Sequence, residues 1–207
     1  LKSTTPISPQ MQLVIDKAET NDLESQFDLG TAYFHGKNIP KSDEKAVYWI
    51  KKAADRDHSE ALSNLGYMYQ HGVGKLEKSD TLAKECFEKS AKLGNPTGQF
   101  NLAICLVKGK GCNKSVKEAL GWLLKAAENN QVNAFCELGY IYLGREVPEI
   151  EKSLDKAFTY FSKAAQKGNS PAMTQLGIFY NEGKLPVQKS TEEALNWFNQ
   201  AANKGDA

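Results

Sequence analysis

The chain has 207 residues, 41% of them hydrophobic, and carries 26 basic and 25 acidic side chains. This apolar content is enough to build a core. The near balance of charge argues against nucleic acid or an anionic membrane as the main partner, because both require clustered positive charge. No apolar run approaches the ~18 residues needed to span a bilayer. The composition therefore predicts neither nucleic-acid binding nor direct membrane insertion.

A short pattern recurs along the chain every 36 to 38 residues. Each copy begins with a Lys-Ser step: Lys41-Ser42, Lys78-Ser79, Lys114-Ser115, Lys152-Ser153 and Lys189-Ser190. An alanine follows four residues after the serine: Ala46, Ala83, Ala119, Ala157 and Ala194. A pair of small residues closes the copy: Ala53-Ala54, Ser90-Ala91, Ala126-Ala127, Ala164-Ala165 and Ala201-Ala202. A fixed period of this length indicates an array in which each supersecondary unit stacks on its neighbours.

The expected elements follow this period from end to end as a single array, 1–207. Residues 9–21 match the second helix of a unit whose first helix is missing. Five units, repeats 1 to 5, then span 22–57, 58–94, 95–130, 131–168 and 169–205, and 206–207 open a further unit. Neither end has the polar cap that such arrays usually need, so we expect the parent protein to extend beyond both ends.

The first helix of each repeat is predicted from a leucine followed by glycine, once by alanine, with a large residue four positions after the leucine. The instances are Leu29 with Tyr33, Leu65 with Tyr69, Leu102 with Leu106, Leu138 with Tyr142, and Leu176 with Tyr180. Positions i and i+4 share one helix face. Because glycine inside a helix costs up to ~1 kcal/mol relative to alanine, its recurrence predicts close approach of a partner helix. Glycines are expected to end these helices: Gly36, Gly72, Gly109, Gly144 and Gly183.

The second helix of each repeat is predicted to begin at the recurring serine, whose hydroxyl can accept an N–H of the first turn. Ser115 with Glu118, and Ser190 with Glu193, are expected to form capping boxes. Large residues follow three and four positions after the alanine, and the later small pair lets the next repeat approach closely. The helix ends are predicted at residues that tolerate a left-handed backbone: Asp57, Gly94, Asn130, Gly168 and Gly205.

The four cysteines do not recur at one repeat position. Cys86 takes the place of Trp49, Trp122, Tyr160 and Trp197, and Cys105 aligns with Ala32, Met68, Ile141 and Phe179. We expect buried, reduced structural thiols rather than disulfides, with Cys112 in a loop. Unpaired thiols favour a reducing compartment. Since the chain begins at Leu1 instead of Met, export by a removed signal stays open.

The combined pattern, Leu-Gly-x-x-Tyr, a helix-ending Gly, then Ala-x-x-Trp-x-x-x-Ala-Ala-x-x-Gly, resembles the Sel1-like repeat, a relative of the tetratricopeptide repeat. The resemblance covers Asp22 to Gly205. It implies an all-α fold, a right-handed α/α superhelix (solenoid) of about five helix-turn-helix repeats, and adaptor roles among its members. One departure is that Lys-Ser replaces the acidic cap common in that family.

In arrays of this type the first helices line a concave surface, and helical phase predicts which side chains face it. These side chains lie two residues before, two residues after and five residues after the recurring leucine of each first helix. The predicted contact residues are Phe27, Thr31, Phe34, Tyr67, Gln70, Phe100, Ile104, Val107, Tyr140, Leu143 and Ile178. An apolar face of this kind is typical of a groove for a peptide or a partner helix. The alternative is that tight curvature buries these residues between neighbouring repeats.

The recurring lysines are a second candidate, an edge that could hold an acidic partner: Lys41, Lys78, Lys114, Lys152 and Lys189. A solvated edge preserved by duplication is the favoured alternative, because exposed charges are strongly screened. The segment 72–75, Gly-Val-Gly-Lys, follows a helix rather than a strand, so a capping loop is expected there instead of a phosphate site. His35 and His71 lie one repeat apart and His58 has no ligand partner nearby, so no metal site is predicted.

The leading hypothesis for function is a non-catalytic scaffold that binds a peptide or helical segment of a partner protein as a monomer or weak homo-oligomer. The alternative is a structural or assembly component of a cell-envelope or secretion complex. A third is an enzyme that binds or hydrolyses β-lactams, as proposed for some members of the resembled family. That chemistry needs a free serine beside a lysine, and the Lys-Ser hydroxyls are expected to be engaged in caps. No catalytic residue or cofactor is therefore predicted.

Overall fold

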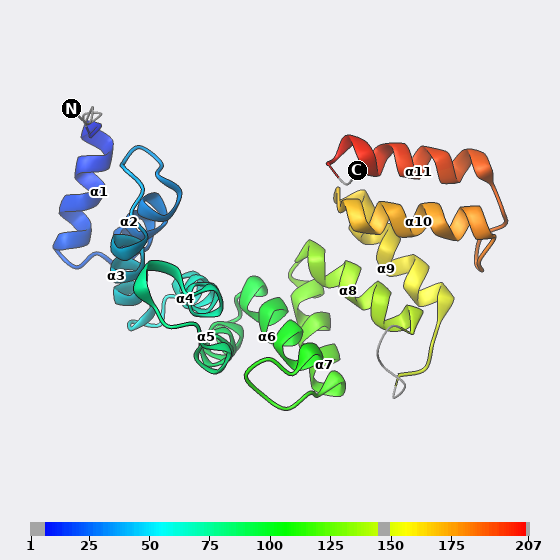
Figure 1. Cartoon of the computed structure of the whole chain (residues 1–207), viewed down its shortest axis with the longest axis horizontal. Helices are drawn as coiled ribbons and strands as arrows, with labels where there is room; N and C mark the ends of the chain where they lie inside the picture. Colours follow the sequence, from blue (N-terminus) through cyan, green and yellow to red (C-terminus); the bar gives the residue numbers. More distant parts are fainter. Residues whose placement is uncertain (1–6, 145–149, 206–207) are drawn as a thin grey trace. The chain divides into compact units, whose positions relative to one another are not determined.

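The protein is described by a computed structural model over residues 7–144 and 150–205. Within these residues the secondary structure is entirely helical (Figure 1), so the all-α prediction is confirmed. The helices are α1 (Pro9–Glu19), α2 (Leu23–His35), α3 (Asp43–Ala54), α4 (Ser59–His71), the 3-10 turn η1 (Val73–Lys75), α5 (Asp80–Lys92), α6 (Pro96–Lys108), α7 (Val116–Glu128), α8 (Val132–Leu143), α9 (Leu154–Gln166), α10 (Ser170–Glu182) and α11 (Thr191–Asn203). None of these described helices is both long enough and apolar enough to cross a bilayer.

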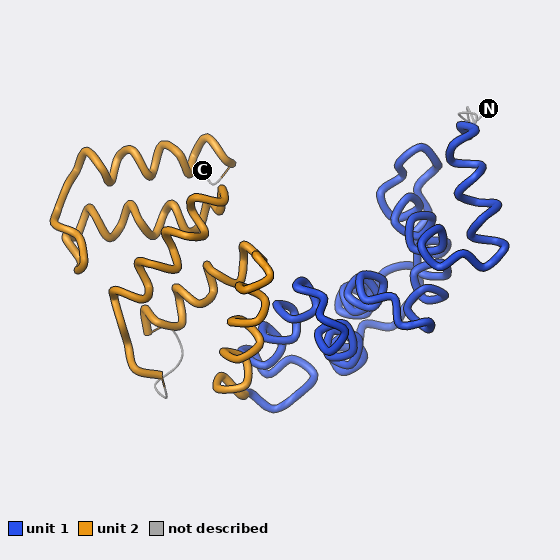
Figure 2. The backbone as a smooth tube through the Cα atoms, turned by 180° about the vertical axis from the view of Figure 1, so that it is seen from behind, with its two compact units in different colours: residues 1–114 blue, residues 115–207 orange. Residues whose placement is uncertain are grey.

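The chain divides into two compact units, residues 1–114 and 115–207 (Figure 2). The first unit holds α1 to α6, with α2 packed on α3 and α4 on α5. The second unit holds α7 to α11, with α8 packed on α9 and α10 on α11. These pairs are the predicted helix pairs of repeats 1, 2, 4 and 5. That the whole chain forms one continuous array stays a prediction from the period, and the further unit expected at 206–207 lies outside the described residues.

Left-handed residues end the helices where the sequence predicts them. The C-caps of the first helices are all glycines with φ between 65° and 90°: Gly36, Gly72, Gly109, Gly144 and Gly183. Only glycine adopts this conformation without a steric cost from Cβ. The second helices are followed by Asp57, Gly94, Asn130, Gly168 and Gly205, which also have positive φ. Both sets of predicted helix ends are confirmed.

The recurring serines cap the second helices, with one exception. The hydroxyls of Ser42, Ser79, Ser153 and Ser190 each accept the N–H three residues ahead, as predicted. Ser115 makes no such bond. Its ψ is 92° rather than the 106° to 108° of the other four, which turns the serine differently against the first turn. The expected side-chain cap at Ser115, and with it the capping box to Glu118, is wrong.

Of the predicted capping box between Ser190 and Glu193, only the bond from the Glu193 N–H to the Ser190 hydroxyl is present. The N–H of Ser190, which a box would pair with Glu193, is donated to the carbonyl of Tyr180 at 2.9 Å. The same backbone bond recurs in the other Tyr-containing repeats, from Ser42 to Tyr33, Ser79 to Tyr69 and Ser153 to Tyr142. It ties the start of each second helix to the first helix of its own repeat. The backbone therefore satisfies the donor that the glutamate would have served.

The glycine inside the first helix allows the second helix to approach closely. A Cβ on Gly66 would lie 2.5 Å from the Phe87 ring, and one on Gly139 would lie 2.6 Å from the Phe161 ring. In the other two repeats that have the glycine, Gly30 faces Ile50 in the same way and Gly177 faces Phe198. Real Cβ atoms do not approach other atoms this closely, so the predicted reason for the glycine is confirmed.

The small pairs are the corresponding contact between successive repeats. Ser90 is fully buried, and a Cβ on Gly98 of the following helix α6 would collide with its hydroxyl. That hydroxyl donates to the carbonyl of Ser59 at 2.7 Å, which satisfies the one polar group in the contact. Small side chains here keep neighbouring helices at backbone-to-backbone range, as predicted.

His58 has a structural role that the sequence did not reveal. It is 8% exposed and caps the N-terminus of α4, where its Nδ1 accepts the N–H of Ala61 at 3.2 Å. Since Nδ1 is the acceptor, the ring proton lies on Nε2, 3.3 Å from the Glu24 carboxylate. The imidazole also stacks on Phe27 with ring centroids 4.5 Å apart. Asp22, Asn95 and Asn169 cap α2, α6 and α10 through shorter side chains.

Replacing Gly139 by alanine tests the close approach of α8 and α9. Alanine gains up to ~1 kcal/mol of helix propensity, but overpacking against Phe161 costs about 1–3 kcal/mol. We expect Gly139→Ala to lower the free energy of unfolding in urea. The matched control is Gly121→Ala in α7, where a Cβ meets no atom within 4 Å and which should raise that free energy by about 0.5–1 kcal/mol. Equal effects of the two changes would contradict the packing role.

Two substitutions of His58 separate its cap from its ring contact. His58→Asn keeps a capping oxygen, as at Asn95 and Asn169, and loses the imidazole contacts with Phe27 and Glu24. His58→Ala loses the cap as well. We expect the alanine variant to be less stable than the asparagine variant by about 1 kcal/mol in urea denaturation, the usual value of an N-cap. Equal stability of the two variants would show that the imidazole acts only as a packing group.

Candidate partner-binding face

The first-helix face is the set of predicted contact residues on α2, α4, α6, α8 and α10. The position two after the leucine is exposed or half-buried in every repeat: Thr31, Tyr67, Ile104, Tyr140 and Ile178. Phe34, Gln70 and Leu143, five after the leucine, are half-buried, as are Phe27 and Phe100. Ten of the eleven predicted residues are thus half-buried or exposed, so they are packed against neighbouring helices in part and remain accessible in part. That they contact a partner stays a prediction.

Val107 is the exception. It is 4% exposed and belongs to the core, so its assignment to an accessible contact surface is wrong. The neighbouring Leu106 is also buried, whereas the other repeats have a half-buried tyrosine at that position. The shorter, wholly apolar leucine has no hydroxyl to keep near water. The buried stripe of α6 therefore extends further around the helix than the repeat pattern indicates.

In the first unit, α2 and α4 bring three of the predicted residues together. Thr31, Phe34 and Tyr67 line a pocket of about 230 Å³, whose other walls include the buried side chains of Ile50 and Met68. The rings of Phe34 and Tyr67 meet edge to face, with centroids 6.2 Å apart and an angle of 84°. Tyr67 is 45% exposed, which is unusual for so large a side chain. We call this cavity the Tyr67 pocket.

Two histidines flank the Tyr67 pocket and were missed as part of it. His35 lies edge to face with Phe34 at 5.1 Å, and His71 packs on Tyr67 at 4.2 Å. Both occupy equivalent repeat positions, and from the sequence they were assessed only as metal ligands. The available signal was their position directly after the five-after-leucine site, which puts them at the edge of the same helix face.

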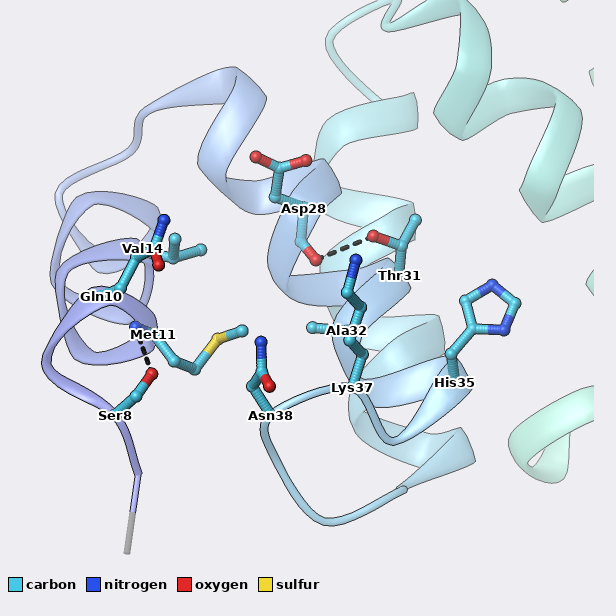
Figure 3. A pocket seen from close by; sticks show the side chains of 10 residues that line it. All are labelled: Ser8, Gln10, Met11, Val14, Asp28, Thr31, Ala32, His35, Lys37 and Asn38. Atoms are coloured by element: carbon cyan, nitrogen blue, oxygen red, sulfur yellow. Dashed lines mark hydrogen bonds between the residues drawn. The ribbon is translucent and has the colours of Figure 1, made fainter.

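A second cavity, of about 510 Å³, lies between α1 and α2 and adjoins Thr31 (Figure 3). Met11 and Val14 of α1 form its apolar wall, and Asp28 of α2 stands on the opposite side. Burial, and then the nearby Glu24 carboxylate, raise the pKa of Asp28. The Thr31 hydroxyl donates to the Asp28 carbonyl at 2.8 Å. The accessible surface around Thr31 therefore continues from the Tyr67 pocket to α1.

The recurring lysines have a structural explanation in the fold. A Cβ on Gly36 would lie 3.2 Å from the Lys41 Cβ, and Gly183 faces Lys189 in the same way at 3.1 Å. The Lys78, Lys114 and Lys152 side chains lie against Gly72, Gly109 and Gly144. Each lysine thus packs on the C-terminal turn of a first helix, where positive charge is favourable. Binding of an acidic partner along this edge stays a prediction.

The described residues offer few groups suited to covalent chemistry. Four of the recurring serine hydroxyls are engaged as caps. Burial raises the pKa of the Cys86 and Cys105 thiols to about 11, which leaves little thiolate near neutral pH. Across residues 7–144 and 150–205, no three His, Cys, Asp or Glu side chains gather where they could hold a metal ion. The segment 72–75 is the C-cap of α4 followed by η1, as expected for a capping loop.

Comparison with known proteins places these observations in a family. Part of the chain, 119 residues or 57% of it, is 30% identical to the ERAD-associated E3 ubiquitin-protein ligase component HRD3B of Arabidopsis thaliana. Among solved structures, a protective antigen of uropathogenic Escherichia coli with an SLR fold matches at 30% identity and a TM-score of 0.78 over 95% of this chain. The chain spans 18% of the plant relative and 41% of the antigen.

A Sel1 repeat protein from Oxalobacter formigenes matches at 27% identity and a TM-score of 0.84, over 92% of this chain and 75% of the other. The predicted class, an all-α repeat array of the solenoid type, is thereby confirmed. The Sel1 repeat model matches the sequence at residues 23–58, 59–95, 96–131, 134–169 and 170–206. With these five copies along nearly its whole length, the chain belongs to the Sel1 repeat family.

Proposed function

We propose that the protein is a non-catalytic interaction scaffold that binds a segment of a partner protein on its first-helix face, centred on the Tyr67 pocket. The observation that carries the proposal is the convergence of Phe34 and Tyr67, from consecutive first helices, around an accessible cavity with an apolar floor. A stiff helical framework presents these side chains without the entropic cost of ordering a loop. Buried aromatic anchors are the residues that most often dominate binding energy at interfaces.

The chemistry of the pocket fits one apolar anchor side chain from the partner. Ile50 and Met68 give an apolar floor, while Asn64 and Thr31 supply polar groups at the wall. A volume of about 230 Å³ accommodates a leucine, methionine or aromatic side chain rather than a whole helix. Phe100 and Ile104 of α6, half-buried in the same unit, offer further contacts to a longer segment.

The relatives support a binding role. The plant protein is by name a component of a ubiquitin ligase, and this chain, which aligns with part of it, consists of Sel1 repeats along nearly its whole length. A role within a protein assembly is therefore the function that both the pocket and the family favour. Four of the recurring serines are engaged as helix caps and burial raises the pKa of Cys86 and Cys105, so these groups favour no reaction.

The Tyr67 pocket is tested by introducing charge on one of two comparable tyrosines. Tyr67 in α4 is 45% exposed and Tyr48 in α3 is 54% exposed, so both tolerate a polar side chain. We expect Tyr67→Asp to weaken partner binding by about tenfold or more, since a charge in the pocket must be desolvated. Tyr48→Asp should leave binding unchanged.

The measurement is quantitative affinity capture from cells with wild-type protein and both variants, followed by titration of the proteins that Tyr67→Asp loses. Circular dichroism and urea denaturation confirm that each variant is folded. Retention of every captured protein by folded Tyr67→Asp, or equal losses in the two variants, would rule out the first-helix face as the binding surface.

A further inference from the structure

In repeats 1 and 4 the second helix contributes an aromatic ring that packs near the tyrosine of the first helix. In repeat 1, Trp49 packs against a core cluster that includes Ala18 and Leu29, and Tyr33 packs against the same cluster. In repeat 4, Tyr160 stacks on Tyr142 with ring centroids 5.7 Å apart and an angle of 5°. In repeat 1 the Trp49 ring thus packs against residues of its own first helix and of the end of the preceding second helix, α1.

Repeat 2 has Cys86 at this position, and the space stays open. A pocket of about 260 Å³ lies beside Cys86, between α3, α4 and α5. Its walls include Ala54, Leu65 and Tyr69, which occupy the repeat positions of Ala18, Leu29 and Tyr33. The surroundings that hold the Trp49 ring in repeat 1 are therefore present here, with a small side chain in place of the ring. We call this pocket the Trp socket.

A lysine accompanies the aromatic ring in repeats 1, 3 and 4 and is retained beside Cys86. Three residues after each ring, Lys52 lies over Trp49 at 5.1 Å, Lys125 over Trp122 at 4.5 Å and Lys163 over Tyr160 at 5.8 Å. A cation above an aromatic face is attracted by the quadrupole of the ring. Lys89 occupies the same step after Cys86 and lines the Trp socket. The socket thus keeps the cation that the missing ring would use.

The opening of the Trp socket is suited to a chain that arrives from outside. Leu82 lines it and is 41% exposed, which adds apolar surface beside the entrance. Lys51, Asp55 and Glu85 surround the same opening and can bond the backbone of a bound segment. An apolar interior with a polar margin is the arrangement found around anchor residues at protein interfaces.

We propose that the Trp socket is a binding site for an aromatic side chain of a partner polypeptide, with tryptophan preferred over tyrosine. In repeats 1 and 4 an aromatic ring carried by the chain itself packs at the corresponding position. A ring attached to a polypeptide therefore has a precedent within this protein. The socket is formed with the second helices α3 and α5 and does not include Tyr67. This inference does not rest on the first-helix face, and either can fail alone.

The first experiment titrates the full chain with N-acetyltryptophanamide and follows leucine methyl resonances by NMR. We expect the methyl signals of Leu62, Leu65 and Leu82 to shift, with an affinity in the millimolar range. The methyl signals of Leu29, the repeat-1 counterpart of Leu65, are the internal control and should not shift, because Trp49 already fills the corresponding pocket. N-acetylleucinamide should bind at least threefold more weakly. Equal shifts at Leu29 and Leu65, or equal affinity for the two amides, would overturn the proposal.

Three variants test the site from the protein side. Cys86→Trp fills the socket with the residue of repeat 1, so binding should be lost while the melting temperature holds or rises. Cys86→Ser keeps the vacancy and should bind within twofold of wild type. Lys89→Gln removes the cation and should weaken binding about two- to fivefold. Retained binding by folded Cys86→Trp would overturn the proposal, and should that variant not fold, unchanged affinity in Lys89→Gln would do so.

The last experiment tests whether the bound ring belongs to a polypeptide or to a small molecule. A short polar peptide with one central tryptophan is compared with the same peptide carrying alanine and with free indole. We expect the tryptophan peptide to bind at least as tightly as N-acetyltryptophanamide and the alanine peptide not to bind. Binding of free indole together with loss of the peptide would assign the pocket to a small molecule and overturn the polypeptide partner. Tyr67→Asp should leave all these affinities unchanged.

Discussion

The contact between a glycine of the first helix and a large apolar side chain of the second sets the geometry of each repeat that has it. Gly66 against Phe87 and Gly139 against Phe161 bring the two helices closer than any other residue would allow. At that distance the N–H of the serine that starts the second helix reaches the carbonyl of the first-helix tyrosine. One steric constraint therefore fixes both the spacing and the register of the pair.

This arrangement leaves the two accessible surfaces that we propose as partner-binding sites. One is the first-helix face, on which Phe34 is half-buried and Tyr67 is exposed. Near the tyrosine of the first helix, the second helix must supply a ring to fill the remaining space. Where the ring is replaced by Cys86, the constraint still holds the walls apart and a cavity results. The second proposed site thus arises from a departure from the repeat.

Much of the fold could be predicted because the signals are local and occur several times. A serine before a helix, a glycine after one, and a leucine four residues from a tyrosine each act within one or two turns of chain. Recurrence in register then makes each signal stronger than a single occurrence. The same reasoning failed at Ser115, which begins a second helix without the side-chain bond that the residue type favours.

The sequence by itself determined the period, the helix pairs and their ends, and it predicted the helix face proposed for partner contact. Only the tertiary structure decided which members of that face are accessible, because exposure depends on side chains from neighbouring helices: Val107 is buried where Phe34 is not. The structure also decided that His58 caps α4 and that Cys86 leaves a cavity. A cavity is the space that several helices together leave unfilled, so the periodicity of a single helix does not predict it.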